Sequence, residues 1–212
     1  MRSSEPSPSP DAASAGHPAP DYLPSNALML KVVVTGPLAV GKTTFVSTVS
    51  EIKSRHTEER MTQAGALVDQ LDGYRADGEA AKTHTTVGTD FGRLTLDERM
   101  VLYLFGSPGQ QRFRVLWDDL VRGALGVLVL VDTSRLEAAF EVMDMVEAAD
   151  VPYAVGVNRF PTSPVHSLGS VRAALDLSPG TPLISVDARD RDECLDALIA
   201  MTRHVLAPLE SV

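Results

Sequence analysis

Cysteine is nearly absent from this sequence, with Cys194 as the single example. One cysteine excludes an intramolecular disulfide, which fits a chain kept in a reducing compartment. Long apolar runs are also lacking, because the longest one, residues 124–131, is far too short to span a bilayer. The sequence therefore excludes a disulfide framework, and we expect no direct insertion into a membrane.

Signals for export or lipid attachment are missing as well. The segment Met1–Glu5 has neither a basic n-region nor an apolar h-region. Arg2 stands where myristoylation needs a glycine, and Pro208–Val212 holds no cysteine for prenylation. We therefore expect a cytoplasmic protein, which partner proteins would have to recruit to the inner face of a membrane.

Basic residues are few relative to acidic ones, with 19 Lys and Arg against 28 Asp and Glu and a net charge of −9. A negative surface repels phosphate backbones, so we expect no nucleic-acid partner. The 212 residues are 44% hydrophobic, which is enough for one globular domain. Residues 1–26 are rich in Pro, Ser and Ala and predict a disordered tail, so the folded domain is expected over 27–212.

From residue 28 onward, short apolar runs alternate with amphipathic segments. The runs predict strands over 28–35, 91–96, 100–105, 124–131, 153–157 and 183–186. Amphipathic segments predict helices near 45–52, 112–122, 136–143, 171–175 and 195–206. Residues 53–85 are polar and predict a long loop, which contains a short helix at 66–71. The alternation predicts an α/β three-layer sandwich with a mostly parallel sheet, and a hairpin at 97–98 places one antiparallel strand at its edge.

A phosphate-binding motif follows the first predicted strand. The segment Gly36-Pro37-Leu38-Ala39-Val40-Gly41-Lys42-Thr43 matches the pattern G-x-x-x-x-G-K-[ST] of P-loop nucleotide-binding proteins. The two glycines allow backbone N–H groups to point at a polyphosphate, and the start of the next helix adds its positive dipole end. Lys42 is expected to reach the β- and γ-phosphates and Thr43 to offer its hydroxyl to Mg²⁺. The predicted nucleotide-binding residues here are Gly36, Leu38, Ala39, Val40, Gly41, Lys42, Thr43 and Thr44.

Two further segments resemble the switches of Rab-like small GTPases. The segment Thr86-Val87-Gly88-Thr89-Asp90-Phe91 resembles their T-x-x-x-D-F pattern, and residues 105–114 resemble W-D-T-A-G-Q-E-R-F-R. Gly in place of the Asp, with Pro before Gly109, is closer to the GTPase-like proteins of actinobacterial conservons, relatives of the gliding-motility GTPase MglA. The resemblance implies a six-stranded sheet of order 2-3-1-4-5-6 and GTP or GDP as the ligand.

The resemblance also assigns roles to individual residues. Thr86 would give its hydroxyl to Mg²⁺ and its backbone N–H to the γ-phosphate, and Gly109 would donate a second N–H. Gln110 would orient the attacking water during GTP hydrolysis. The expected catalytic residues are thus Lys42, Thr86 and Gln110, and the expected Mg²⁺ ligands are Thr43 and Thr86. Loss of the γ-phosphate would release both segments, which is a transition that partners can sense.

Two departures from the family pattern concern the phosphates and the metal. Gly106 replaces the Asp that supports Mg²⁺ through water, which should weaken metal binding or shift this role to Asp90 or bulk water. Leu38 stands at a position that is commonly glycine, where its side chain would crowd the space above the γ-phosphate. We therefore predict slow intrinsic hydrolysis.

A third departure concerns the base. The segment Asn158-Arg159-Phe160-Pro161 stands where the family has N-K-x-D. Asn158 would tie this loop to the phosphate loop, and the aliphatic stem of Arg159 would lie on the base. Pro161, however, replaces the carboxylate that accepts hydrogen bonds from guanine N1–H and N2–H₂, so base selectivity stays open.

The loop after the last predicted strand resembles the family's S-A-K motif. It reads Asp187-Ala188-Arg189, and the resemblance implies that the Ala188 N–H contacts guanine O6. Asp187 could supply part of the acceptor function that Pro161 lacks. These three residues, with Asn158 and Arg159, complete the predicted base site.

The sequence thus predicts a slow GTPase-like switch in bacterial signalling. The resemblance implies a roadblock-type regulatory protein and a sensor-kinase-like complex at the membrane as partners. Two alternatives stay open. One is an ATP-binding NTPase in which Asp132, after an apolar strand, supplies a metal carboxylate, although Asp132 could equally cap the next helix. The other is a non-hydrolysing scaffold, which Leu38, Gly106 and Pro161 favour.

Overall fold

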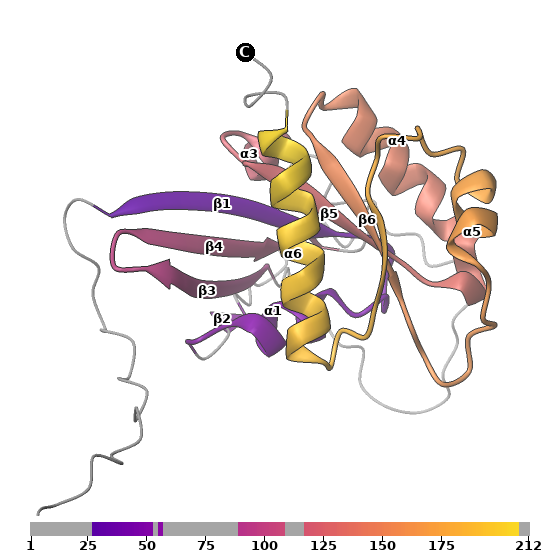
Figure 1. The fold of residues 1–212 in the computed structure, drawn as a ribbon, viewed down its shortest axis with the longest axis horizontal. Coiled ribbons are helices and arrows are strands. Elements are labelled where there is room, and N and C mark those ends of the chain that lie inside the picture. The colour runs from indigo at the N-terminus through magenta and orange to yellow at the C-terminus, as the bar shows by residue number, and fades with distance from the viewer. Residues whose placement is uncertain (1–26, 53–54, 57–88, 109–116, 208–212) are drawn as a thin grey trace, which may run out of the picture.

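A computed structural model gives the fold of the chain and describes residues 27–52, 55–56, 89–108 and 117–207 (Figure 1). The strands are β1 (Leu28–Thr35), β2 (Arg55–His56), β3 (Asp90–Asp97), β4 (Met100–Gly106), β5 (Gly126–Val131), β6 (Tyr153–Asn158) and β7 (Leu183–Val186). The helices are α1 (Lys42–Val49), α3 (Trp117–Val121), η2 (Thr133–Ala139, a 3₁₀ helix), α4 (Phe140–Ala148), α5 (Leu168–Ala174) and α6 (Arg191–Leu206).

The strands form one sheet in the order β2-β3-β4-β1-β5-β6-β7. Strand β1 pairs in parallel with β4 and β5, and β6 and β7 continue the parallel part. Strand β3 runs antiparallel to β4 through the expected hairpin. The six strands predicted from the apolar runs therefore occur, in the predicted order, which confirms the α/β P-loop fold class.

The sheet also has a seventh strand that the sequence placed in a polar loop. Residues Arg55 and His56 pair with Phe91 and Asp90 of β3, so β2 rather than β3 is the outermost strand. A strand of two polar residues carries no alternating or apolar pattern, so nothing in the local sequence could mark it. The expected helix at 66–71, the tail 1–26 and residues 112–116 of the helix expected over 112–122 lie outside the described residues, while α3 occupies most of the remaining part of that helix.

Helices cover both faces of the sheet, which gives three layers (Figure 1). Even-numbered residues of β1, Val32 and Val34, pack with α1 and α6 in one core cluster. Val33, between them, packs on the opposite face in a second cluster with α3, α4 and α5. Strand β5 is buried at every position, as expected for the centre of a parallel sheet. Within the described ranges, no helix has the length and apolar character needed to cross a membrane.

The carboxyl ends of β1, β4, β5, β6 and β7 lie at one edge of the sheet, because these strands run in the same direction. Antiparallel β3 begins at that edge, where Asp90 is opposite Gly106 in the register. In open α/β sheets, ligands bind outside the carboxyl ends of the strands. The residues predicted to bind nucleotide follow these strand ends, so the topology collects them at one edge.

Candidate functional site

The loop after β1 has an unusual backbone conformation. Gly36, Ala39 and Gly41 have positive φ angles of 141°, 63° and 100°. A Cβ atom on Gly36 would lie 2.3 Å from the Leu130 carbonyl oxygen, and one on Gly41 would lie 2.5 Å from Asn158 Nδ2. The Leu130 backbone and the Asn158 side chain thus leave no room for a side chain at either glycine. The loop can adopt this shape only with glycine at its two ends.

Lys42, the first residue of α1, turns its side chain back onto this loop. Its Nζ donates hydrogen bonds to the carbonyl oxygens of Gly36 at 2.8 Å and Pro37 at 2.7 Å. Burial lowers the pKa of Lys42 to about 8, while the negative charge of Asp90 acts in the opposite direction. The loop therefore holds a buried cation beside its own backbone, which is the charge that a polyphosphate requires.

Thr43, the next residue, is linked to β3. Its hydroxyl donates a hydrogen bond of 2.5 Å to Oδ2 of Asp90, whose side chain is buried. A Cβ atom on Gly106 would lie 2.9 Å from Asp90 Cβ and 3.0 Å from Oδ2, so the glycine leaves the room that the Asp90 side chain fills. A hydroxyl and a carboxylate are oxygen donors of the kind that Mg²⁺ prefers, and this donor set fits the ion. Thr86, the second predicted ligand, lies outside the described residues.

Asp132, at the end of β5, caps the helix that follows. Its carboxylate accepts hydrogen bonds from Ser134 N at 2.9 Å, Ser134 Oγ at 2.7 Å and Ser163 Oγ at 2.6 Å. Burial alone would raise the pKa of Asp132, but the hydrogen bonds from the two serines lower it. The carboxylate is thus engaged as the N-cap of η2, which is the structural role that the sequence left open.

Asn158 joins three loops at the end of β6. It is buried, its Nδ2 donates to the Val40 carbonyl oxygen at 2.9 Å, and its Oδ1 accepts from the Ala188 N–H at 3.0 Å. The Ala188 N–H, which the resemblance assigns to guanine O6, therefore donates to the side-chain oxygen of Asn158 in this structure. This bridge fixes the loop after β7 relative to the phosphate loop.

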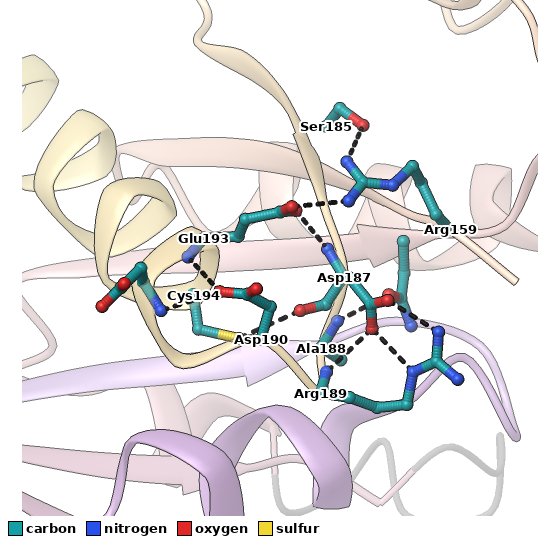
Figure 2. A network of polar contacts seen from close by, with 10 residues as sticks. Arg159, Ser185, Asp187, Ala188, Arg189, Asp190, Glu193 and Cys194 are labelled. Carbon is teal, nitrogen blue, oxygen red and sulfur yellow. Dashed lines mark hydrogen bonds and ion pairs between the residues drawn. The ribbon is translucent and has the colours of Figure 1, made fainter.

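Charged side chains form a network around the predicted base site (Figure 2). Arg159 donates to Glu193 Oε1 at 2.6 Å, and Glu193 Oε2 accepts from the Asp187 N–H at 2.8 Å. The Asp187 carboxylate accepts two hydrogen bonds from the Arg189 guanidinium, at 2.6 and 2.8 Å. These bonds from Arg189 hold the pKa of Asp187 down at about 2. The carboxylate suggested as a substitute acceptor is thus an ionised group with a guanidinium partner.

Sequence reasoning missed two residues of this edge. Glu193, in the first turn of α6, connects the loops after β6 and β7, yet no motif distinguishes it from the other acidic residues of that turn. Arg135 donates from Nη2 to the Leu38 carbonyl oxygen at 3.3 Å, and its φ of −145° and ψ of 50° interrupt η2. The contact joins residues 97 positions apart, so no local pattern could reveal it. The predicted residues Gly109 and Gln110 lie outside the described ranges.

The fold and the phosphate loop together define a P-loop α/β protein that binds nucleotides. Residues 34–208 match the family described as conserved hypothetical ATP binding protein. This match covers most of the chain, and the protein therefore belongs to that family.

Individual relatives are more distant. An uncharacterized protein of Methanocaldococcus jannaschii is 26% identical over 132 residues, covering 61% of this chain and 70% of that protein. The Ras-related protein RABD2b of Arabidopsis thaliana is 25% identical over 138 residues, covering 60% and 68%. The human Ras-related protein Rab-3A is 27% identical over 119 residues, which are 55% of this chain and 43% of Rab-3A. The chain is thus weakly similar to Rab proteins as well as belonging to an ATP-binding family.

Proposed function

We propose that this protein is a nucleotide-dependent switch that binds GTP with Mg²⁺ at the phosphate loop and hydrolyses it slowly. The observation that carries the proposal is the strained loop 36–41 closed around the Lys42 ammonium. Backbone N–H groups of this loop and of the first turn of α1 would bind the β-phosphate, and Lys42 would move from the loop carbonyl oxygens to the phosphates.

The metal would bind at the Thr43 hydroxyl, with Thr86 as a second ligand. Mg²⁺ neutralises and orients the phosphates when it is bound. Gly109 would donate its N–H to the γ-phosphate, and Gln110 would orient the attacking water. Leu38, which is 59% exposed, stands at the loop position that is commonly glycine in Ras-type proteins, and this supports a slow reaction.

Guanine would be bound by the loops after β6 and β7. Asn158 holds these loops against the phosphate loop, and Arg159 would lay its aliphatic stem along the base. The Ala188 N–H would be shared between Asn158 and guanine O6. Asp187, with Arg189 beside it, is the carboxylate proposed to replace the acceptor that Pro161 lacks.

An ATP-binding protein is the second candidate, and the comparisons favour it at least as well. The family to which the chain belongs is described as ATP binding. Pro161 cannot accept hydrogen bonds from the guanine edge, and Asp187 is already hydrogen-bonded by Arg189. A non-hydrolysing scaffold is distinguished from both by the absence of turnover.

The cellular role is proposed from the sequence resemblance alone. The pattern at residues 105–114 resembles that of the MglA-like GTPases of actinobacterial conservons, which suggests bacterial signalling in the cytoplasm. A roadblock-type regulatory protein would bind the switch segments. A sensor-kinase-like complex would recruit the protein to the inner face of the membrane.

The decisive experiment is a panel of affinities for labelled GTP, GDP, ATP and XTP, each in Mg²⁺ and in EDTA. We expect GTP and GDP to bind at least about tenfold more tightly than ATP, which is about 1.4 kcal/mol. Lys42→Ala is the control and should abolish binding of every nucleotide. Equal affinities for ATP and GTP would favour the second candidate. Tight nucleotide binding with no phosphate released in a parallel turnover assay would support the scaffold.

A further inference from the structure

Asp90 and Gly106 face each other across the β3–β4 ladder, at the edge of the sheet that carries the phosphate loop. The Rab-like pattern has Asp at both positions, and the Asp that supports the metal is the one at the position of Gly106, which this chain lacks. Here the strand β4 has no side chain at this point, and the Asp90 carboxylate enters the same space from β3. The Asp90 Oδ2 ends within 2.5 Å of the Thr43 hydroxyl oxygen.

We propose that Asp90 has taken over, from the neighbouring strand, the positioning of Mg²⁺ at Thr43. The proposal rests on the proposed function, because it requires a metal and a nucleotide at the phosphate loop. It makes Asp90 a positioning residue that acts through Thr43. This role explains how a chain with Gly106 can still have a carboxylate beside Thr43.

The chemistry of the Thr43 hydroxyl supports this role. A hydroxyl has one proton and two lone pairs, and Thr43 gives its proton to Asp90. The lone pairs are then free for a cation, and the nearby carboxylate makes the oxygen a stronger donor. Asp90 is buried, so its negative charge acts on a cation with little screening by water. Asp90 therefore orients the Thr43 hydroxyl, which is the metal ligand, and also places a negative charge near the cation.

In this structure the Asp90 side chain fills the space that a side chain at position 106 would need. A Cβ atom there would lie 2.9 Å from Asp90 Cβ, closer than such atoms approach in folded proteins. A carboxylate on β4 therefore cannot be added while the Asp90 side chain keeps its present conformation. Conversely, a carboxylate built from position 106 would begin 3.0 Å from the present Asp90 Oδ2 and could reach the same point.

The test is the ratio of nucleotide dissociation constants in EDTA and in saturating Mg²⁺, measured on the full chain with a fluorescent nucleotide. For Asp90→Asn we expect this ratio to fall on the order of 10- to 100-fold relative to the unmodified protein. The affinity in EDTA should stay the same or rise, because a negative charge near the phosphates is removed. Asp132→Asn is the matched control, since it neutralises another buried carboxylate at this edge whose hydrogen bonds come from Ser134 and Ser163 and not from the phosphate loop or α1.

A strand-exchange variant separates metal positioning from folding. Gly106→Asp alone should lower the Mg²⁺ ratio and the melting temperature, because two carboxylates then compete for one space. The double variant Asp90→Gly with Gly106→Asp should recover the ratio to within about threefold of the unmodified protein, roughly 0.6 kcal/mol. Mn²⁺ binding, followed by electron paramagnetic resonance in the presence of GDP, gives a readout that does not depend on turnover.

An unchanged ratio in folded Asp90→Asn, or a double variant that folds without recovering the ratio, would overturn the inference. The proposed function has a separate point of failure. If the unmodified protein binds no nucleotide in either buffer, the switch itself is refuted. If it binds nucleotide equally well in Mg²⁺ and EDTA, nucleotide binding stands and the metal-positioning role of Asp90 falls.

Discussion

The Lys42 ammonium is held against two carbonyl oxygens of the phosphate loop and is largely removed from water. Burial lowers its pKa to about 8, so the free protein loses this proton within an accessible pH range. A bound polyphosphate adds negative charge beside the ammonium and raises the pKa again. Between the two pKa values, binding must therefore take up a proton.

The affinity for nucleotide is expected to be constant below about pH 8 and to weaken above it, by up to about tenfold per pH unit. Titrations from about pH 7 to about pH 9.5 would measure this slope, and calorimetry in two buffers would count the proton directly. Lys42→Arg is the matched control, because a guanidinium stays charged throughout and should remove the slope. A flat profile in the unmodified protein would contradict the role assigned to Lys42.

Gly36 is a second residue of the phosphate loop whose replacement should have a large effect. A methyl group there would meet the Leu130 carbonyl oxygen at 2.3 Å, in a backbone conformation that L-residues rarely adopt. Gly36→Ala is expected to lower the free energy of unfolding by about 2 kcal/mol or more, since strain and overpacking add. Gly180→Ala is the control, because a Cβ atom there meets nothing within 4 Å. Denaturant unfolding of both variants would test the difference, and equal stabilities would contradict it.

At the level of elements, the strands could be predicted because their burial is a local property. Every residue of β5 is buried, and the apolar run that predicts it has nearly the same bounds. Strand β2 could not be predicted, since two polar residues become a strand only by pairing with β3. The same distinction applies to the site: the motif at residues 36–43 is contiguous in sequence, whereas the contact between Asp90 and Thr43 depends on how β3 and β4 are paired.

The first turn of α6 links two loops that no motif connects. Glu193 pairs with Arg159 after β6 and accepts the Asp187 N–H after β7. The Arg159 and Glu193 side chains are 50% and 33% exposed, so the ion pair itself contributes about 1 kcal/mol or less. We therefore expect the Arg159–Glu193 pair to act mainly by fixing the positions of the loops after β6 and β7.

Glu193→Ala is expected to weaken nucleotide binding by about fivefold, roughly 1 kcal/mol, because the base loops lose a common anchor. Binding of inorganic tripolyphosphate should not change, since that ligand has no base. Asp192→Ala is the matched control, as it removes the same charge from an exposed position in the same turn. Competition assays with both ligands would measure the effect. Equal losses for nucleotide and tripolyphosphate would show that Glu193 acts on the phosphate loop instead.

Across the whole molecule, one edge of the sheet brings together segments that lie far apart in the sequence. The phosphate loop, the Asp90–Gly106 pair and the loops at Asn158 and Ala188 are tied by direct hydrogen bonds. A ligand that binds the phosphate loop therefore acts on strands from both halves of the sheet. Asp90 connects this edge to β3, the strand that begins with the last two residues of the first predicted switch segment, 86–91.

This connection predicts where a diphosphate and a triphosphate complex differ. If the γ-phosphate engages Thr86 and Gly109, hydrogen exchange near 86–92 and 106–111 should be slower with a non-hydrolysable GTP analogue than with GDP. The loops at Asn158 and Ala188 should be equally protected in both complexes, because the base and the α- and β-phosphates are common to them. Mass spectrometry of the exchanging amides would locate the difference. Identical exchange in the two complexes would show that the protein binds nucleotide without sensing the γ-phosphate. A segment that contacts the γ-phosphate must open more easily when this phosphate is lost, and its amide hydrogens would then exchange faster.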